Sequence, residues 1–297
     1  MPSPPEPTVR KKYVGAQLKR MREQANLTRE TVAGRLDCWP SKIGRIENGL
    51  SAPGGADLEI MLDLYGTQDP DLRASLSLLS RRSRSVSRRG WWHRYAEVLE
   101  PGDLERISME SEVAAIRNFE TVLVPGLLQT EEYARAVMAG CGYTPEAAAP
   151  FVAVRMARQQ VLARPDAPRF LAVVDEAALH RCVGGPEVMA AQLRRLLEVN
   201  DTSRCCLRVL PFEAGAHAGL DGPFTILSYD RPVGLEVAVV EHREARHYAE
   251  QPEQVARYRA VFDDLLARAL SPEDSRDLIA RVAQRHQERR RTPEGAQ

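Results

Sequence analysis

Two short helical patterns separated by a three-residue break constrain the fold of this chain more than any other feature. Thr28 is a favourable N-cap for the first pattern, which runs to about Leu36. The break is Asp37–Trp39, and Pro40 suits the first turn of a second helix that stops at Gly49. We therefore expect two helices that cross each other at a sharp turn.

The side chains inside this pattern have the sizes that two crossing helices require. Ala33 is the small residue expected at the crossing point. The apolar residues expected to face the core or to lock the second helix onto the first are Val32, Leu36, Ile43 and Ile46. Asp37 occupies the turn, where positive φ is favoured, and Asp tolerates that conformation better than most residues.

Helical spacing of apolar residues predicts further helices on both sides of this pattern. They span 9–25, about 58–65 and about 70–80, which gives five helices in all. A chain of 297 residues is also long enough for two domains. The expected organisation is a disordered tail over 1–8, a five-helix domain over 9–80, an Arg/Ser linker over 81–90, a second domain over 91–290 and a disordered tail over 291–297.

The second domain mixes helical patterns with short β-branched segments bounded by Gly or Pro. Strands are predicted over 170–174, 205–210, 224–229 and 235–240. Helices are predicted over 109–120, 131–139, 151–163, 186–199, 254–270 and 275–289. The expected fold class is mostly α, with a five-helix N-terminal domain followed by an α+β domain of helices and four strands.

The net charge of zero conceals an asymmetry between the two parts. Residues 1–90 hold 16 Lys and Arg against 10 Asp and Glu, a balance of +6, so the remainder carries −6. A basic first domain points to a polyanionic partner. No apolar run reaches the about 20 residues that cross a bilayer, and the five cysteines include no Cys-x-x-Cys. We therefore expect a protein of the reducing cytoplasm with no membrane partner.

From Leu27 to Gly49 the chain resembles the Xre/Cro family of phage-repressor-like regulators. The resemblance is carried by Leu27–Leu36 and Ser41–Gly49, in which Ile-Glu-x-Gly closes the second helix at the correct spacing from Ala33. It implies a lambda-repressor-like five-helix domain whose second crossing helix, the recognition helix, enters the major groove of an operator duplex. It also implies a transcription regulator associated with the nucleoid.

The implied DNA contacts follow from that placement. Base contacts are expected from Trp39, Pro40, Ser41, Lys42 and Arg45, and Arg45 is best suited to a bidentate contact with guanine. Phosphate contacts are expected from Arg10, Lys11, Lys12, Arg29 and Asn48. Glu47 resembles the family's structural acid, which implies that it fixes the loop at Gly49 and does not touch DNA.

Residues 91–290 resemble the C-terminal domain of an actinobacterial family of Xre-type, antitoxin-like regulators. The matching segments are Trp91–Trp92, Glu110–Ala114, Val124–Thr130, Arg155–Gln159, Asp175–Leu179, Val209–Phe212 and Ala269–Pro272. This resemblance implies transcriptional regulation and a small partner protein encoded nearby.

Catalytic motifs are absent from the sequence. It contains no Gly-x-Ser-x-Gly, no P-loop and no dinucleotide fingerprint, and His242 and His247 miss the four-residue step that aligns two metal ligands on a helix. Asp175 and Glu176 end a strand, where paired acids more often cap the following helix than act as an acid and base. We therefore expect no enzyme, no cofactor and no metal site.

Other functions remain open at this point. The Gly215–Gly219 loop, with His217 at its centre and Phe212 and Phe224 nearby, either closes over a small-molecule effector or is only a turn. The helix-turn-helix could also belong to a protein-interaction adaptor that no longer binds DNA. For a DNA-binding protein we expect a homodimer, because two half-sites about one helical turn apart raise affinity and specificity.

Overall fold

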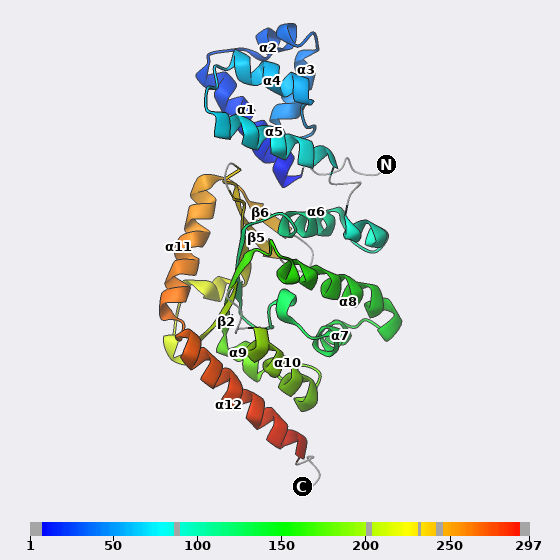
Figure 1. The fold of residues 1–297 in the computed structure, drawn as a ribbon, viewed down its shortest axis with the longest axis vertical. Coiled ribbons are helices and arrows are strands. Elements are labelled where there is room, and N and C mark those ends of the chain that lie inside the picture. Colours follow the sequence, from blue (N-terminus) through cyan, green and yellow to red (C-terminus); the bar gives the residue numbers. More distant parts are fainter. Residues whose placement is uncertain (1–7, 86–89, 200–203, 231–232, 242–245, 292–297) are drawn as a thin grey trace. The chain divides into compact units, whose positions relative to one another are not determined.

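The chain folds into two compact units, each built from segments that are distant in the sequence. The computed structural model describes residues 8–85, 90–199, 204–230, 233–241 and 246–291. Unit 1 consists of Met1–Arg94, Pro101–Ser108 and Tyr229–Leu235, and unit 2 of Tyr95–Glu100, Met109–Ser228 and Glu236–Gln297. Helices dominate unit 1, whereas unit 2 combines helices with a sheet (Figure 1).

Unit 1 contains the five N-terminal helices that the sequence predicts. Their bounds are α1 Val9–Gln24, α2 Arg29–Arg35, α3 Pro40–Glu47, α4 Gly55–Leu64 and α5 Pro70–Ser85. The Thr28 hydroxyl caps α2 as expected, because it accepts the Thr31 backbone N–H at 3.2 Å. Pro40 is the first residue of α3, where its missing N–H costs no helical hydrogen bond.

The predicted linker and tails are described only in part. α5 extends to Ser85, so the first half of the Arg/Ser segment is helical and is not a linker. The other half, 86–89, lies outside the described residues, as do 1–7 and 292–297 of the two tails. Thr8, placed in the first tail by its sequence, is the ordered N-cap of α1.

Two tryptophans follow this segment. Trp91 and Trp92 lie in a short 3₁₀ helix, Trp91–Tyr95, which is followed by α6, Pro101–Glu110. Their rings meet edge to face with centroids 5.9 Å apart, and Trp92 is buried. Both belong to unit 1, whereas the sequence places them at the start of the second domain. The pair is therefore a packing anchor of unit 1.

A close backbone approach fixes α1 against α3. A Cβ atom added at Gly15 would lie 2.3 Å from the Ile46 carbonyl oxygen and 2.8 Å from that of Glu47. At Gly49, where φ is 72°, an added Cβ would lie 2.8 Å from the Lys12 Cα. These two glycines let the backbones of α1 and α3 meet directly. The role of Gly15 was not predicted, because a glycine inside a helical pattern has no unique interpretation.

Unit 2 is built on a mixed sheet with strand order β3-β2-β1-β4-β5-β6. The bounds are β1 Ala115–Glu120, β2 Arg169–Asp175, β3 Cys205–Leu210, β4 Phe224–Ser228, β5 Glu236–Glu241 and β6 Arg246–Ala249. β1, β2 and β3 are parallel, with Ile116 paired to Phe170 and Phe170 to Cys205. The pairs β1–β4, β4–β5 and β5–β6 are antiparallel.

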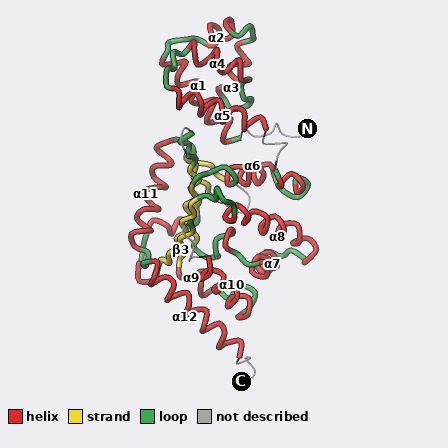
Figure 2. The backbone as a smooth tube through the Cα atoms, in the orientation of Figure 1, coloured by secondary structure: helices red, strands yellow, loops and turns green. Residues whose placement is uncertain are grey.

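Helices supply the crossovers that the parallel strands require and cover both faces of the sheet. Their bounds are α7 Glu131–Gly140, α8 Pro145–Gln159, α9 Glu176–His180, α10 Pro186–Val199, α11 Pro252–Arg268 and α12 Pro272–Arg291, with 3₁₀ helices at Gly126–Leu128, Gln160–Ala163, Phe212–Ala214 and Ala218–Asp221. Figures 1 and 2 show α11 on one side of the strands and α7, α8 and α10 on the other. Beneath α11 the core contains Phe119, Ile226, Phe262 and Leu265.

The four predicted strands are present, but the predicted helix over 109–120 is wrong. Residues 115–120 of that segment form β1, a central strand. Its buried residues, Ile116, Asn118 and Phe119, do not alternate in hydrophobicity, so the period of two is hidden. β6 is the second missed strand: at the edge of the sheet, its sequence Arg-His-Tyr-Ala carries no apolar pattern. The described sheet therefore has six strands.

Candidate nucleic-acid interface

The turn between α2 and α3 has the geometry expected of a helix-turn-helix. Asp37 has φ of 46°, as predicted for this position. The Cys38 N–H donates to the Ala33 carbonyl at 3.0 Å, which closes the turn directly over the small residue at the helix crossing. Ala33 is 1% exposed, so no larger side chain would fit there without moving a helix. The turn therefore fixes the direction in which α3 leaves α2.

α3 has one buried side and one exposed side. Ile43 and Ile46 are buried in unit 1, as predicted. Ser41, Lys42 and Arg45, three of the predicted base contacts, are exposed on the same helix. Asn48, a predicted phosphate contact, caps the end of α3 and is also exposed. The first two turns of α3 therefore present polar and basic side chains to solvent.

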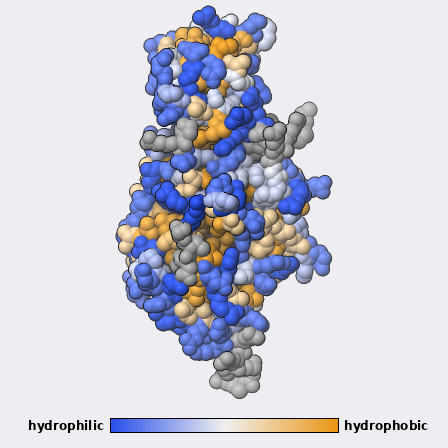
Figure 3. Space-filling view, in the orientation of Figure 1, coloured by the Kyte–Doolittle hydropathy of each residue, from blue (hydrophilic) through white to orange (hydrophobic). Residues whose placement is uncertain are grey.

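Trp39 and Pro40 begin this exposed surface. Trp39 is the N-cap of α3 and is 81% exposed, more than any other large hydrophobic side chain among the described residues. The face that Figure 3 shows is mostly hydrophilic, with several apolar patches. Aromatic residues are enriched at interfaces, so the exposed Trp39 at the start of α3 is a candidate contact residue. Pro40 is half-buried beside it.

A buried carboxylate locks α3 to the two preceding helices. Glu47 Oε1 accepts from Arg22 Nε at 2.5 Å, and Glu47 Oε2 accepts from Arg22 Nη2 at 3.2 Å and Arg29 Nε at 2.8 Å. Burial acts to raise the pKa of Glu47, but the hydrogen bonds from the two arginines outweigh it and lower that pKa. Glu47 is therefore structural, as predicted, but through Arg22 and Arg29 and not through the loop at Gly49.

Lys42 and Arg45 differ in what holds their side chains. Lys42 Nζ lies 2.8 Å from the Asp57 carboxylate of α4, and this hydrogen bond raises the pKa of Lys42. Arg45 is exposed, and its side chain makes no hydrogen bond or ion pair within the described parts of the chain. The sequence does not predict the contact with Asp57, because only the fold brings the start of α4 beside α3. Arg45 is thus the cation of this surface that is available to a new partner.

The predicted phosphate contacts divide into available and unavailable side chains. Lys12 is exposed and Lys11 half-buried on α1, and Arg29 keeps 39% of its side chain exposed while bonded to Glu47. Arg10 is fully buried. The prediction for Arg10 is therefore wrong in this structure, and the remaining four residues stay candidates.

Arg10 is buried because its guanidinium contacts other residues of unit 1. Its guanidinium donates to the Tyr229 hydroxyl from Nη2 at 3.1 Å and from Nε at 3.3 Å, and to Ser108 Oγ at 3.1 Å. Tyr229 and Ser108 belong to the two segments of unit 1 that are distant in the sequence. The neighbouring Val9 N–H donates to Glu105 at 2.5 Å. A count of basic residues along α1 could not reveal these partners.

The three residues of the predicted effector loop contact different aromatic rings. His217 and Phe224 both pack on the Phe119 ring, with centroid distances of 6.2 and 5.9 Å. Phe212 is exposed and stacks on His180 at 5.9 Å. Asp175 Oδ1 accepts the Ala177 N–H at 2.8 Å and thus caps α9, the helix-capping role expected from the sequence.

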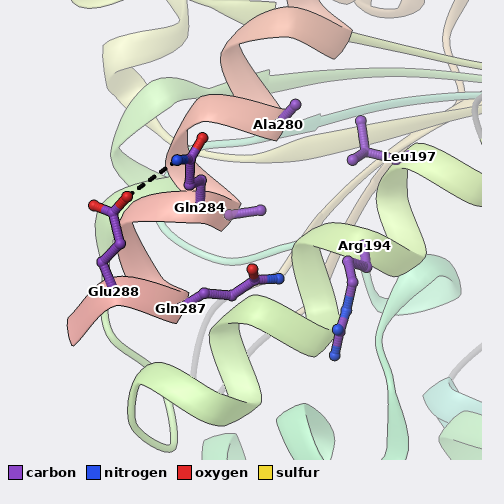
Figure 4. A pocket seen from close by; sticks show the side chains of 7 residues that line it. Arg194, Leu197, Ala280, Gln284, Gln287 and Glu288 are labelled. Carbon is purple, nitrogen blue, oxygen red and sulfur yellow. Dashed lines mark hydrogen bonds between the residues drawn. The ribbon is translucent and has the colours of Figure 1, made fainter. Parts of the chain in front are cut away.

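Elsewhere in unit 2, a surface hollow of about 400 Å³ lies between α10 and α12. Figure 4 shows Arg194 and Gln287 bordering it from the two helices, and Gln284 donates to Glu288 at 3.0 Å along α12. In the described parts of the chain, no three His, Cys, Asp or Glu side chains are placed to hold a metal ion. No helix in those parts is long and apolar enough to cross a bilayer.

The fold and surface of unit 1 define a helix-turn-helix domain, and comparison with known families agrees. Residues 14–76 match a family described as a helix-turn-helix domain, which supports a DNA-binding regulator. The family described as domain of unknown function (DUF5753) matches residues 105–281, which are more than half of the chain. The chain therefore belongs to that family. No curated protein and no solved structure matches the chain.

Proposed function

We propose that this protein is a sequence-specific transcription regulator of the Xre/Cro type that reads its operator with the exposed side of α3. The observation that carries the proposal is the division of α3 into two sides. Glu47 and two isoleucines fix the inner side, and Arg45 is exposed and unbonded on the outer side. A rigid helix with free polar side chains at its start is what major-groove recognition requires.

Each side chain of this surface has a distinct part in the proposal. Arg45 donates two hydrogen bonds to a guanine, and Ser41 and Lys42 contact neighbouring base edges. Trp39 places its ring against a thymine methyl group beside Pro40. Lys11, Lys12, Arg29 and Asn48 contact phosphates and hold the helix in register.

The proposal extends to assembly and regulation. The protein binds its operator as a homodimer, because one recognition helix alone buries little surface. It acts in the cytoplasm and associates with the nucleoid. The resemblance of residues 91–290 to antitoxin-like regulators supports a regulatory role for unit 2, which takes a small partner protein or an effector. The proposal includes no catalytic step and no cofactor.

The direct test is binding of the full-length protein to duplexes from its own promoter over a range of salt concentrations. We expect log affinity to fall linearly with log salt, with a slope of about −4 to −5 for four to six phosphate contacts. Arg45→Ala should lose affinity on the promoter duplex, whereas Arg35→Ala, at an exposed arginine that ends α2, should not. The absence of duplex binding at low salt would favour an adaptor that no longer binds DNA.

A further inference from the structure

A second cavity in unit 2, separate from the hollow in Figure 4, has a different character. Its volume is about 190 Å³, and it lies among the 3₁₀ helix after β1, the ends of α8 and α10, and the start of β3. Its lining includes Leu127, Leu128, Leu162, Val199 and Cys205. All of these residues lie within the part of the chain that matches the DUF5753 family.

The walls of this cavity are largely apolar. Leu127 and Leu128 are buried, and so is the Cys205 side chain, whose pKa burial raises to about 12. Cys205 is therefore a neutral thiol at neutral pH and acts as part of the apolar lining. The amide of Gln159 is already used, because it donates to the Gln129 carbonyl at 2.7 Å and to the Gly126 carbonyl at 3.2 Å. The walls offer few polar groups to a ligand.

The rim of the cavity carries charged side chains, in contrast to the apolar walls. Two of its residues are cationic, Arg195 and Arg204, and one is acidic, Glu198. Arg204 uses Nη1 to donate to the Ala167 carbonyl at 2.7 Å. Arg195 Nη1 lies 3.7 Å from Glu198, whose side chain is 69% exposed. The rim thus keeps an excess of positive charge beside an apolar interior.

We propose that this cavity binds a small molecule with an apolar ring or short branched chain and one carboxylate. The volume limits the ligand: an apolar cavity of about 150 Å³ accommodates benzene, so this one has room for one ring and little more. The ring lies among Leu127, Leu162 and Cys205, and the carboxylate faces Arg195 and Arg204. A carboxylate suits a guanidinium because its two oxygens can accept two parallel N–H hydrogen bonds.

This inference deepens the regulatory role proposed for unit 2, and its test uses no DNA, so it can fail while the DNA-binding proposal stands. Benzoate is the probe, and benzamide is its uncharged counterpart of nearly the same shape. Thermal unfolding of the full-length protein is followed as each is added at constant ionic strength, together with saturation-transfer NMR of the ligand. We expect benzoate to raise the unfolding temperature saturably and benzamide to bind at least about threefold more weakly.

The helix α10 offers a matched control for the charge at the rim. Arg195→Gln should weaken benzoate binding by about threefold or more, and Glu198→Gln should strengthen it. Arg194→Gln changes the neighbouring arginine, which borders the other hollow, and should leave benzoate binding unchanged. These side chains are exposed, so the substitutions should not unfold the protein.

A second pair of variants locates the ligand in the cavity. Ala163 is exposed at the cavity mouth, and Ala163→Phe should fill the space and abolish benzoate binding. Ala153→Phe places the same ring on an exposed position of α8 away from the lining and should bind as the unchanged protein does. The proposal is overturned if benzoate binds without saturation, if benzamide binds equally well, or if the two members of either pair behave alike.

Discussion

The two units secure their helices with buried carboxylates in different ways. In unit 1, Glu47 of α3 joins Arg22 and Arg29 on the two preceding helices. In unit 2, Glu110 joins Arg158 of α8 through two hydrogen bonds of 2.8 and 3.0 Å. Both carboxylates are almost fully buried, with 0% and 4% of the side chain exposed.

The difference lies in what the rest of each helix does. α3 alternates residues that fasten it with residues that face solvent, so Arg45 stays free while Glu47, two positions later, is locked. In unit 2, Arg155 donates to Gln129 at 2.8 Å and Arg208 donates to the Ala269 and Leu270 carbonyls at 2.6 Å, so these arginines hold internal segments together. On α3, Arg45 is thus kept away from the carboxylates of its own unit, whereas Lys42 is held by Asp57.

Removing Glu47 should have the largest effect on stability. Glu47→Ala leaves Arg22 buried without its carboxylate, and we expect unit 1 to lose about 3–5 kcal/mol. Hydrogen exchange of the amides in residues 9–80 measures the loss in unit 1, and affinity for the promoter duplex should fall with it. A loss below about 1 kcal/mol would mean that Glu47 does not secure α3.

The lowered pKa of Glu47 predicts that the stability of unit 1 depends on pH. Because the pKa of Glu47 is lowered in the folded protein, its contribution is fully present above the unfolded pKa of about 4.5 and is lost as pH falls through the lower folded value. The free energy of unfolding of unit 1 should therefore fall with acid in this range. Glu47→Gln should lose this part of the acid dependence. An unchanged profile in that variant would assign the dependence to other groups.

Removing Glu110 separates stability from DNA binding. Glu110→Ala leaves Arg158 without its carboxylate and should destabilise unit 2 by about 2–4 kcal/mol, measured by exchange of the amides in residues 109–228. At a temperature where the variant and the unchanged protein are both folded, the duplex affinity of the variant should stay within about twofold of that of the unchanged protein. A large loss of DNA binding in this variant would contradict the functional separation of the two units.

The next largest effect on stability is expected at Gly15, where α1 and α3 approach each other closely. Gly15→Ala places a methyl group against two backbone carbonyls and should cost about 1–3 kcal/mol. Gly34→Ala is the matched control: Gly34 is exposed in α2 with no atom near the added Cβ, and alanine there should stabilise by up to about 1 kcal/mol. Equal effects at both sites would show that α1 and α3 do not meet at Gly15.

The smallest expected effect concerns Asp57. Asp57→Asn removes the charge that holds Lys42 and should change duplex affinity by about 0.5 kcal/mol, toward tighter binding with a steeper salt dependence. Affinities of both proteins at several salt concentrations measure this change. If the variant binds more weakly with the same slope, Asp57 aims Lys42 at the duplex and does not compete with it.

The sequence predicts features that depend on neighbouring residues. The cap at Thr28, the helix start at Pro40, positive φ at Asp37 and the five N-terminal helices all depend on local conformation and spacing, and all are present. What it misses depends on long-range contacts. Arg10 is buried by Tyr229, more than 200 positions away, and Lys42 meets Asp57 only after α4 folds beside α3.

The strands show the same limit. β2–β5 have β-branched or apolar runs bounded by Gly or Pro, and the sequence predicts them. β1 is central and has buried residues on both faces, so its apolar residues do not alternate with polar ones. Their spacing matches that of a helix by coincidence. The surroundings of the predicted effector loop also depend on long-range contacts: Phe212, which is near His217 and Phe224 in the sequence, stacks on His180 in the fold.

The central claim is that the free side of α3 reads bases, and Arg45 tests it most directly. Selection of duplexes from a random library by the full-length protein and by Arg45→Ala compares their base preferences position by position. We predict that the variant loses its preference for guanine at one base pair of each half-site, with a cost of about 1–3 kcal/mol there, and keeps its other preferences. Identical preferences for the two proteins, with affinity reduced equally on every duplex, would contradict the account.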